Sequence, residues 1–210
     1  MAAVTVAFAL ALAGCGGGSG NSAAGPATPA ASAIATTPTE AAAPDAPKES
    51  AVKPEDNPPG DIPDNLAFVK YRNAAGGYSF THPEGWARTV KGTTVNFTDK
   101  LNGVTVELRQ TSAPTVASAK QVDVPELRRT QAAFELKSVS AVKLGAGSGV
   151  KIVYRRNSAP DPVTGREYRD EIERYEIWVG DHELVMELYG PVGADNVDAY
   201  RVMLDSLTAR

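Results

Sequence analysis

The feature that most constrains this chain is a long stretch near its amino terminus without aromatic side chains. Residues 16–65 hold nine of the 15 prolines and no Phe, Trp or Tyr. Such a segment has too little apolar surface to offset the entropy that ordering would cost. Residues 66–210 hold both Trp, all seven Tyr and four of the five Phe. We therefore predict a disordered linker followed by one domain of about 145 residues.

A short apolar run precedes this linker. Residues 2–13 are apolar except for Thr5, and the run is shorter than the roughly 20 residues that span a bilayer. It is typical of the apolar part of a secretion signal. Leu12-Ala13-Gly14-Cys15 follows directly and resembles the lipobox of bacterial lipoproteins. The resemblance implies cleavage between Gly14 and Cys15 and acylation of Cys15; an uncleaved apolar segment is the alternative.

These observations predict three parts of the chain and a location. We expect a lipoprotein signal peptide over residues 1–14, a lipidated Cys15 with a disordered linker over residues 15–65, and a folded domain over residues 66–210. Two acyl chains hold a protein stably on a membrane, so we expect a palmitate-bearing lipoprotein on the extracytoplasmic face of the cell membrane. A linker that binds the cell wall or a partner is the alternative for residues 15–65. Met1 is not followed by Lys or Arg, which departs from the usual signal pattern.

Charge excludes one class of partner. Residues 66–210 contain 19 Lys or Arg and 18 Asp or Glu, so the domain is almost neutral. Nucleic-acid binding requires a basic surface that displaces phosphate counterions. We therefore expect no nucleic-acid partner.

Alternating apolar residues in the domain predict antiparallel strands. Residues 93–98 and 104–110 alternate, and Asn102-Gly103 between them indicates a hairpin turn. Further strands are predicted over residues 78–81, 136–144, 149–156, 168–179 and 183–189. Turns are predicted at residues 82–86, 161–165 and 180–181.

Two helices are also predicted. Asp123 fits an N-cap and Pro125 a first helical turn, so a helix is expected from there to about Phe134. Residues 195–207 place apolar side chains at helical spacing, which predicts a second helix with one packed face. Those side chains are Val197, Tyr200, Leu204 and Leu207. Hairpin-paired strands with packed helices predict an α+β sandwich.

The sequence also resembles a known family. GYSFTHPEGW at residues 77–86 is similar to the opening motif of PsbP-like domains, and residues 174–177 and 205–207 resemble a later strand and the final helix. The resemblance covers about residues 68–210. It implies a PsbP-like antiparallel sheet with packed helices in an α/β/α sandwich, as in the LpqN-type lipoproteins of actinobacteria. It implies no catalytic residues, because members of this fold serve unrelated functions.

Catalytic chemistry has weak support in the sequence. His82 lies at a turn and His182 between two acids, where local hydrogen bonding or solvation explains them better than a metal site. Gly145-Ala146-Gly147-Ser148-Gly149 lacks the first Gly of a nucleophile elbow and is expected to be a hairpin loop. Carboxylates over residues 167–176 alternate with arginines, which favours cross-strand ion pairs. We therefore predict no enzyme, no catalytic residue, no metal and no cofactor.

Aromatic residues are the remaining candidates for ligand contact. Trp86, Trp178 and Tyr175 would be the anchors of a binding surface, although aromatic side chains in strands usually belong to the core. The arginine pairs at 128–129 and 155–156 could hold an anion, but adjacent strand residues point apart.

These observations favour a lipid-anchored envelope protein that binds an unidentified envelope protein or ligand without catalysis. A carrier of an apolar lipid is the alternative, and it would need an apolar cavity of roughly 300 Å³ or more. An envelope hydrolase has the least support.

Overall fold

Two antiparallel sheets form the framework of the domain. The computed structural model describes residues 49–210, so the predicted signal peptide, Gly14, Cys15 and most of the predicted linker lie outside the described residues. Strands β3 (Ala87–Lys91), β4 (Thr94–Asp99), β5 (Asn102–Arg109), β9 (His182–Pro191), β8 (Arg169–Val179), β7 (Gly147–Asn157) and β6 (Glu135–Leu144) form one sheet in that order. Strands β1 (Phe68–Asn73), β2 (Tyr78–Pro83) and β10 (Thr208–Ala209) form the other.

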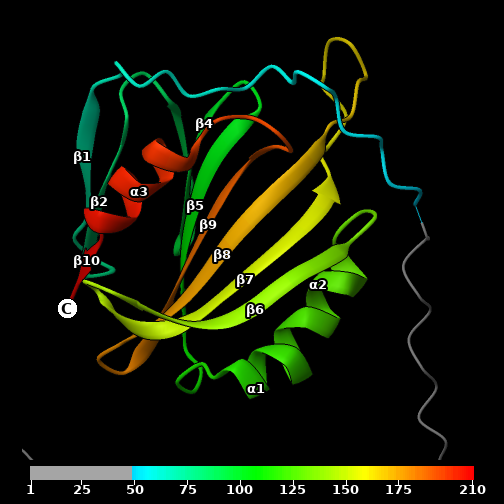
Figure 1. Cartoon of the computed structure of the whole chain (residues 1–210). Helices are drawn as coiled ribbons and strands as arrows, with labels where there is room; N and C mark the ends of the chain where they lie inside the picture. The colour runs from blue at the N-terminus through cyan, green and yellow to red at the C-terminus, as the bar shows by residue number, and fades with distance from the viewer. Residues whose placement is uncertain (1–48) are drawn as a thin grey trace, which may run out of the picture. The chain divides into compact units, whose positions relative to one another are not determined.

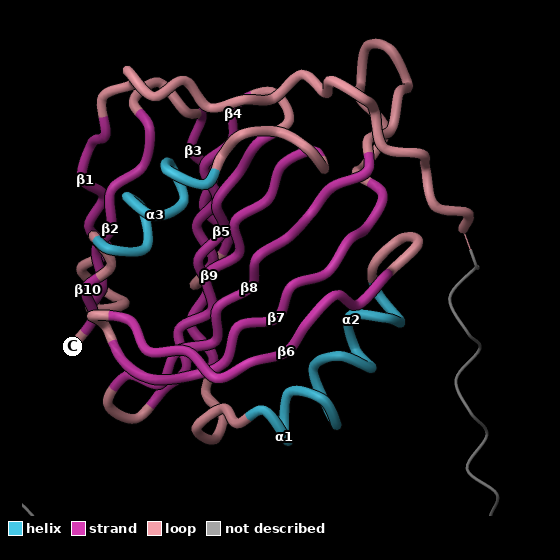
Figure 2. Tube along the Cα trace, viewed as in Figure 1, coloured by secondary structure: helices cyan, strands magenta, loops and turns pink. Residues whose placement is uncertain are grey.

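Helices cover both faces of the seven-stranded sheet (Figures 1 and 2). Helix α3 (Val197–Asp205) and the three-stranded sheet lie on one face, where the larger core cluster is formed. A continuous helical segment lies on the other face and consists of α1 (Val116–Ser118), the π-helical turn η1 (Ala119–Asp123) and α2 (Val124–Thr130). The predicted α+β class with an antiparallel sheet is confirmed. Among residues 49–210, no helix is both long and apolar enough to cross a membrane.

The period of two along β8 explains how one strand serves both layers. Tyr175, Ile177 and Val179 belong to the core beneath α3, whereas Ile172 belongs to the core beneath α2. The predicted strands over 136–144, 149–156, 168–179 and 183–189 are confirmed as β6 to β9. The hairpin predicted at residues 145–149 is present between β6 and β7, but its turn is only residues 145–146, because residues 147–149 already pair with β6 as the start of β7.

The predicted hairpin over residues 93–110 is confirmed, but its turn lies earlier than Asn102-Gly103. Lys100 takes the positive φ of the turn, and Asn102 and Gly103 already pair with β4. Gly103 is required by the neighbouring strand, because a Cβ there would lie 2.2 Å from the Tyr189 ring. Gly103 therefore reflects a close contact with the neighbouring strand, although Asn-Gly in a sequence usually indicates a turn.

The first predicted helix begins earlier than expected. Thr115 is the N-cap, and its side chain and that of Ser118 form a reciprocal capping box. Asp123 makes no capping bond and instead lies 3.7 Å from the Arg109 guanidinium. The prediction of Asp123 as the cap was wrong because the helix continues upstream through the π-helical turn.

The second predicted helix is confirmed as α3, with one correction. Leu204 and Leu207 are buried, but Val197 is 71% exposed, because it lies at the start of the helix, beyond the core. The strands β1, β3 and β10 had no counterpart in the sequence predictions.

Residues 49–65 contact the folded domain, so the prediction of a disordered linker is wrong for this part. They run across the ends of the strands (Figure 1). Ile62 is 4% exposed, and its backbone N–H donates to Asn196 Oδ1 at 2.8 Å. At the other end, the Val52 N–H donates to Asn157 Oδ1 at 3.0 Å. Composition alone missed this segment because its order comes from backbone hydrogen bonds to distant side chains.

Candidate functional site

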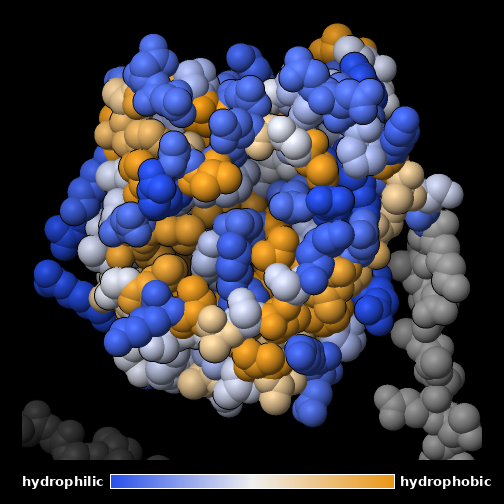
Figure 3. All heavy atoms as spheres, in the orientation of Figure 1, coloured by the Kyte–Doolittle hydropathy of each residue, from blue (hydrophilic) through white to orange (hydrophobic). Residues whose placement is uncertain are grey.

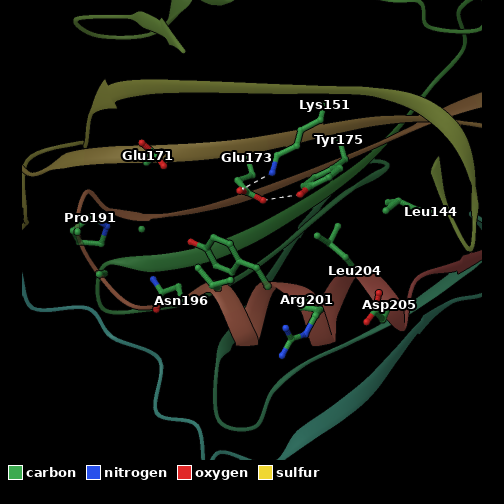
Figure 4. Close-up of a pocket in the computed structure, with 15 residues that line it drawn as sticks. Leu144, Lys151, Glu171, Glu173, Tyr175, Pro191, Asn196, Arg201, Leu204 and Asp205 are labelled. Atoms are coloured by element: carbon green, nitrogen blue, oxygen red, sulfur yellow. Dashed lines mark hydrogen bonds and ion pairs between the residues drawn. The ribbon is translucent and has the colours of Figure 1, made fainter. Parts of the chain in front are cut away.

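A cleft of about 350 Å³ lies between α3 and strands β7 and β8 of the seven-stranded sheet (Figure 4). We call it the α3 cleft. Its floor comes from β7 and β8, and its walls come from α3 and the loop that connects β9 to α3. Its lining includes Lys151, Glu173, Tyr175, Val197, Tyr200 and Leu204. Its volume lies within the usual range for small-molecule pockets.

The floor of the cleft carries a connected set of three polar side chains. Lys151 Nζ donates to Glu173 Oε1 at 2.7 Å, and the Tyr175 hydroxyl donates to Glu173 Oε2 at 2.6 Å (Figure 4). Lys151 Nζ also lies 5.2 Å from the centre of the Tyr175 ring. Burial, reinforced by the bond to Glu173, raises the pKa of Tyr175. Tyr175 is therefore a neutral hydrogen-bond donor.

Strand register explains why these side chains meet. Lys151 on β7 pairs with Tyr175 on β8, and Glu173 lies two residues before Tyr175 on the same face. The period of two along β8 places Glu173 and Tyr175 on one face, whereas Lys151 belongs to a different strand. The pairing of β7 with β8 decides that contact, and the spacing of the residues along the chain does not show it.

The wall opposite this floor is partly apolar. Leu204 projects from α3 toward the sheet, and Leu144 lies at the end near the β6–β7 hairpin (Figure 4). Tyr200 of α3 also lines the cleft. Burial raises the pKa of Tyr200 as well, so its hydroxyl is also neutral. The cleft therefore combines an apolar wall with charged groups on its floor.

A hydrogen-bonded cluster surrounds Asn196, the residue that precedes α3. Asn196 Nδ2 donates to Asn102 Oδ1 at 2.9 Å, and Asn102 Nδ2 donates to the Gly60 carbonyl at 2.7 Å. The loop before α3 is thereby tied to β5 and to residues 49–65. We infer that this cluster fixes the width of the α3 cleft.

The size of the cleft meets the requirement of the carrier alternative, but its lining does not. An acyl chain would cover Lys151, Glu173, Arg201 and Asp205 together with the apolar side chains, and removing charged groups from water is costly even where, as for Lys151 and Glu173, they pair with each other. The lining fits a ligand that has both polar and apolar surface.

The structure places only one of the three predicted ligand contacts in the cleft. Tyr175 lies on its floor. Trp86 is 7% exposed and belongs to the core. Trp178 is half-buried and, three residues after Tyr175, points to the opposite face of β8.

Neither histidine lines the α3 cleft. His82 Nδ1 lies 2.9 Å from the Pro83 carbonyl, and its ring stacks on Phe97 at 3.8 Å between centroids. Burial lowers the pKa of His82. His182 Nδ1 lies 3.0 Å from Asp181 Oδ1, but its side chain is only 14% exposed, so solvation was the wrong description. Within residues 49–210, no group of three or more potential ligands could hold a metal ion.

The predicted cross-strand ion pairs are confirmed at β7 and β8. Arg155 Nε pairs with Glu171 Oε2 at 2.8 Å on the cleft side of the sheet. The anion-binding alternative for arginine pairs is not supported by their arrangement. Arg156 bonds to Gln131 on the opposite face, and Arg129 bonds to Glu126 on α2.

One ion-pair network is buried, and its burial was not predicted from the sequence. Arg174 Nε donates to Glu176 Oε1 and Arg174 Nη1 donates to Glu187 Oε1, both at 2.7 Å. Glu176 is fully buried, and its Oε2 has no partner among the described residues. Glu183 lies on the same face, and burial together with Glu176 raises its pKa to about 7. The alternation of arginines and acids along the sequence does not show which ion pairs become buried beneath a helix.

Comparisons with known proteins gave structural similarities only. No protein-family model matches the chain, and no curated protein matches its sequence. The cyanobacterial PsbP protein (CyanoP) of Synechocystis aligns with 73% of this chain and all of its own, at 17% identity and a TM-score of 0.49. The Ran-binding protein Mog1p of Saccharomyces cerevisiae aligns with 69% of this chain and 96% of its own, at 12% identity and a TM-score of 0.47. LpqN of Mycobacterium tuberculosis, described as involved in cell envelope biogenesis, aligns with 69% of this chain and 91% of its own, at 15% identity and a TM-score of 0.42.

Proposed function

We propose that this protein is a non-catalytic binding module of the cell envelope, anchored on the extracytoplasmic face of the membrane through Cys15, and that it takes its ligand in the α3 cleft. The observation that carries the ligand site is the cleft itself, with the Lys151, Glu173 and Tyr175 set facing an apolar wall. The lipobox-like segment at residues 12–15 supports the anchor.

The polar groups of the cleft support binding rather than catalysis. Glu173 uses both of its oxygens to accept bonds from Lys151 and Tyr175, and Lys151, which lines the cleft, has three donors in all. General acid–base catalysis needs a titrating group within hydrogen-bond reach of the substrate. The two histidines, which titrate nearest to neutral pH, lie outside the cleft.

The chemistry of the cleft indicates the kind of ligand. An ammonium group only donates hydrogen bonds and a carboxylate only accepts them. A ligand with hydroxyl or amide groups satisfies both, and an attached apolar part would contact Leu204 and Tyr200. We therefore propose an amphiphilic envelope molecule or a partner segment of the same character.

We also infer that the domain belongs to the PsbP-like group. The support is the motif at residues 77–86, which forms β2 and the turn before Trp86. Gly85 in that motif has a φ of +84°, a conformation that favours glycine.

Photo-cross-linking in intact cells tests the ligand site. A photoreactive amino acid at Val197, on the exposed rim of the cleft, is expected to capture an adduct of defined mass. The same amino acid at Val122, an exposed valine on η1 and 64% accessible, is the matched control. Lys151→Met should reduce the adduct at Val197 by about tenfold, because a hydrogen bond to a charged group is worth roughly 1.5–3 kcal/mol. Equal capture at both valines, or no effect of Lys151→Met, would contradict the proposal.

Metabolic labelling tests the anchor separately. Cells fed an alkynyl fatty acid should incorporate the label into the protein, and Cys15→Ser should abolish it because Cys15 is the only thiol in the chain. Persistence of the label in Cys15→Ser would refute acylation at this position. A Ser19→Ala variant, in the adjoining Gly/Ser run, is the control that should keep the label.

A further inference from the structure

The outer face of the three-stranded sheet gathers positive charge in a nearly neutral domain. In a paired antiparallel sheet, opposed residues lie on the same face. Arg72 pairs with Ser79 and Ser79 with Thr208, which places these three in one row across the sheet. Lys70 lies two residues before Arg72, and Arg210 lies two residues after Thr208, so both project from this face. The opposite face carries Tyr71, Tyr78 and Phe80, which pack together, and Tyr71 and Phe80 pack against Phe97.

A hollow of about 530 Å³ lies among these side chains, and we call it the β10 hollow. Its lining includes Lys70, Arg72, Ser79, Thr208 and Arg210, and no Asp or Glu. Figure 3 shows strongly hydrophilic side chains projecting on the side of the molecule where Figure 1 places β1 and β10.

The three cations of this hollow are available to a ligand. Lys70, Arg72 and Arg210 are exposed, and within residues 49–210 none of them lies within 4.0 Å of a side-chain carboxylate. By contrast, Arg155, Arg169 and Arg174 are all paired with acids. A main-chain carboxylate on Arg210 would offset one of the three positive charges, and the face would still be positive.

The hollow also offers hydroxyl groups. Ser79 Oγ and Thr208 Oγ1 lie 2.8 Å apart, so one of the two hydroxyl protons is used between them and the other is free to donate. Neighbouring strands are about 4.8 Å apart and alternate residues about 6.8 Å apart. The long side chains of Lys70 and Arg72 can therefore reach a single group above these hydroxyls.

We propose that the β10 hollow binds the phosphate group of a polar phosphate ester. A phosphate presents three strong acceptor oxygens, which match cationic donors that converge from separate strands and a hydroxyl donor between them. A carboxylate has two oxygens and would be satisfied by one arginine. The volume of the hollow exceeds that of a bare phosphate ion, so it also accommodates the esterified alcohol. This inference does not depend on the α3 cleft.

Binding measurements on the full chain with Cys15→Ser test the proposal without interference from acyl chains. The probes are inorganic phosphate and glycerol 3-phosphate by titration calorimetry, and phosphatidylcholine vesicles with or without phosphatidylglycerol by co-sedimentation. We expect saturable binding of glycerol 3-phosphate, and a loss of affinity of at least about tenfold in Lys70→Gln/Arg72→Gln. Arg72→Lys with Lys70 intact should retain part of the affinity.

Lys91→Gln/Lys143→Gln is the matched control, because it also removes two exposed positive charges that have no ion-pair partner within residues 49–210. Its affinity for glycerol 3-phosphate should remain within twofold of the parent chain. An equal loss in both double variants would show general attraction to charge and overturn the proposal. Failure of the parent chain to bind any probe would overturn it as well, since the sheet that forms the hollow is intact in that chain.

The two groups of probes distinguish the source of the phosphate. Binding to phosphatidylglycerol vesicles that requires Lys70 and Arg72 and is displaced by glycerol 3-phosphate would identify a lipid headgroup. Binding of glycerol 3-phosphate without vesicle binding would identify a soluble ester. Vesicle binding that does not respond to Lys70→Gln/Arg72→Gln would count against the site.

Discussion

Arg174→Met is expected to lower the free energy of unfolding by about 3–5 kcal/mol, because it leaves buried carboxylates without their cation. Arg174 bonds to Glu176, which has no exposure, and to Glu187. Methionine preserves much of the apolar side-chain volume, so the loss of unfolding free energy measures the contribution of the positive charge. Urea unfolding at pH 7 measures the effect.

The control is Arg155→Met, which removes the partner of Glu171 on the solvated side of the same strand pair. Exposed pairs contribute about 0–1 kcal/mol, so this variant should change little. Adding Glu176→Gln to Arg174→Met should recover part of the lost stability. If the two arginine variants lose equal stability, the network beneath α1, η1 and α2 is not electrostatically buried.

Glu183→Gln is expected to stabilise the domain by about 2–3 kcal/mol at pH 8 and to have little effect at pH 4. Burial, followed by the neighbouring charge of Glu176, raises the pKa of Glu183 from 4.5 to about 7. An acid with a raised pKa binds more protons in the folded state than in the unfolded state between these values. Its contribution to stability is therefore present at low pH and is lost as the pH rises from about 4.5 to about 7.

Glutamine resembles the protonated carboxyl group, so Glu183→Gln removes this loss. The stability difference between Glu183→Gln and the parent chain should grow across that pH range in urea unfolding. Glu107→Gln, on the neighbouring strand and with a 38% exposed side chain, should change stability by less than about 0.5 kcal/mol at any pH. A Glu183→Gln variant that is less stable at pH 8 would mean that the ionised carboxylate is needed by Arg109 and Arg174.

The strands β4, β5 and β7 to β9 could be predicted because buried side chains recur along them with a period close to two. The helix over 195–207 could be predicted because three of its four apolar positions face the core. The strand β3 could not, since all five of its residues are exposed and edge strands lack the apolar pattern of central ones. The order of residues 49–65 could not be predicted either, because it depends on Asn102, Asn157 and Asn196, which lie far away in sequence.

The α3 cleft and the β10 hollow differ in how much of each could be predicted from the sequence. Glu173 and Tyr175 lie on one strand, so their common face follows from a period of two. Lys151 joins them only through the register of β7 against β8. Lys70 and Arg72 lie on β1 and Arg210 directly follows β10, and these two strands are more than 130 residues apart in the chain.

The sequence by itself predicted a linker followed by one folded domain, because composition indicates whether a segment can bury enough surface to fold; residues 49–65, which contact the domain, were wrongly assigned to the linker. It also determined the lipobox-like segment around Cys15, because that pattern consists of adjacent residues. Only the tertiary structure decided which charges are buried, which residues line the α3 cleft and which cations meet at the β10 hollow. Charge burial and side-chain convergence depend on contacts between distant strands, and no local spacing along the chain records them.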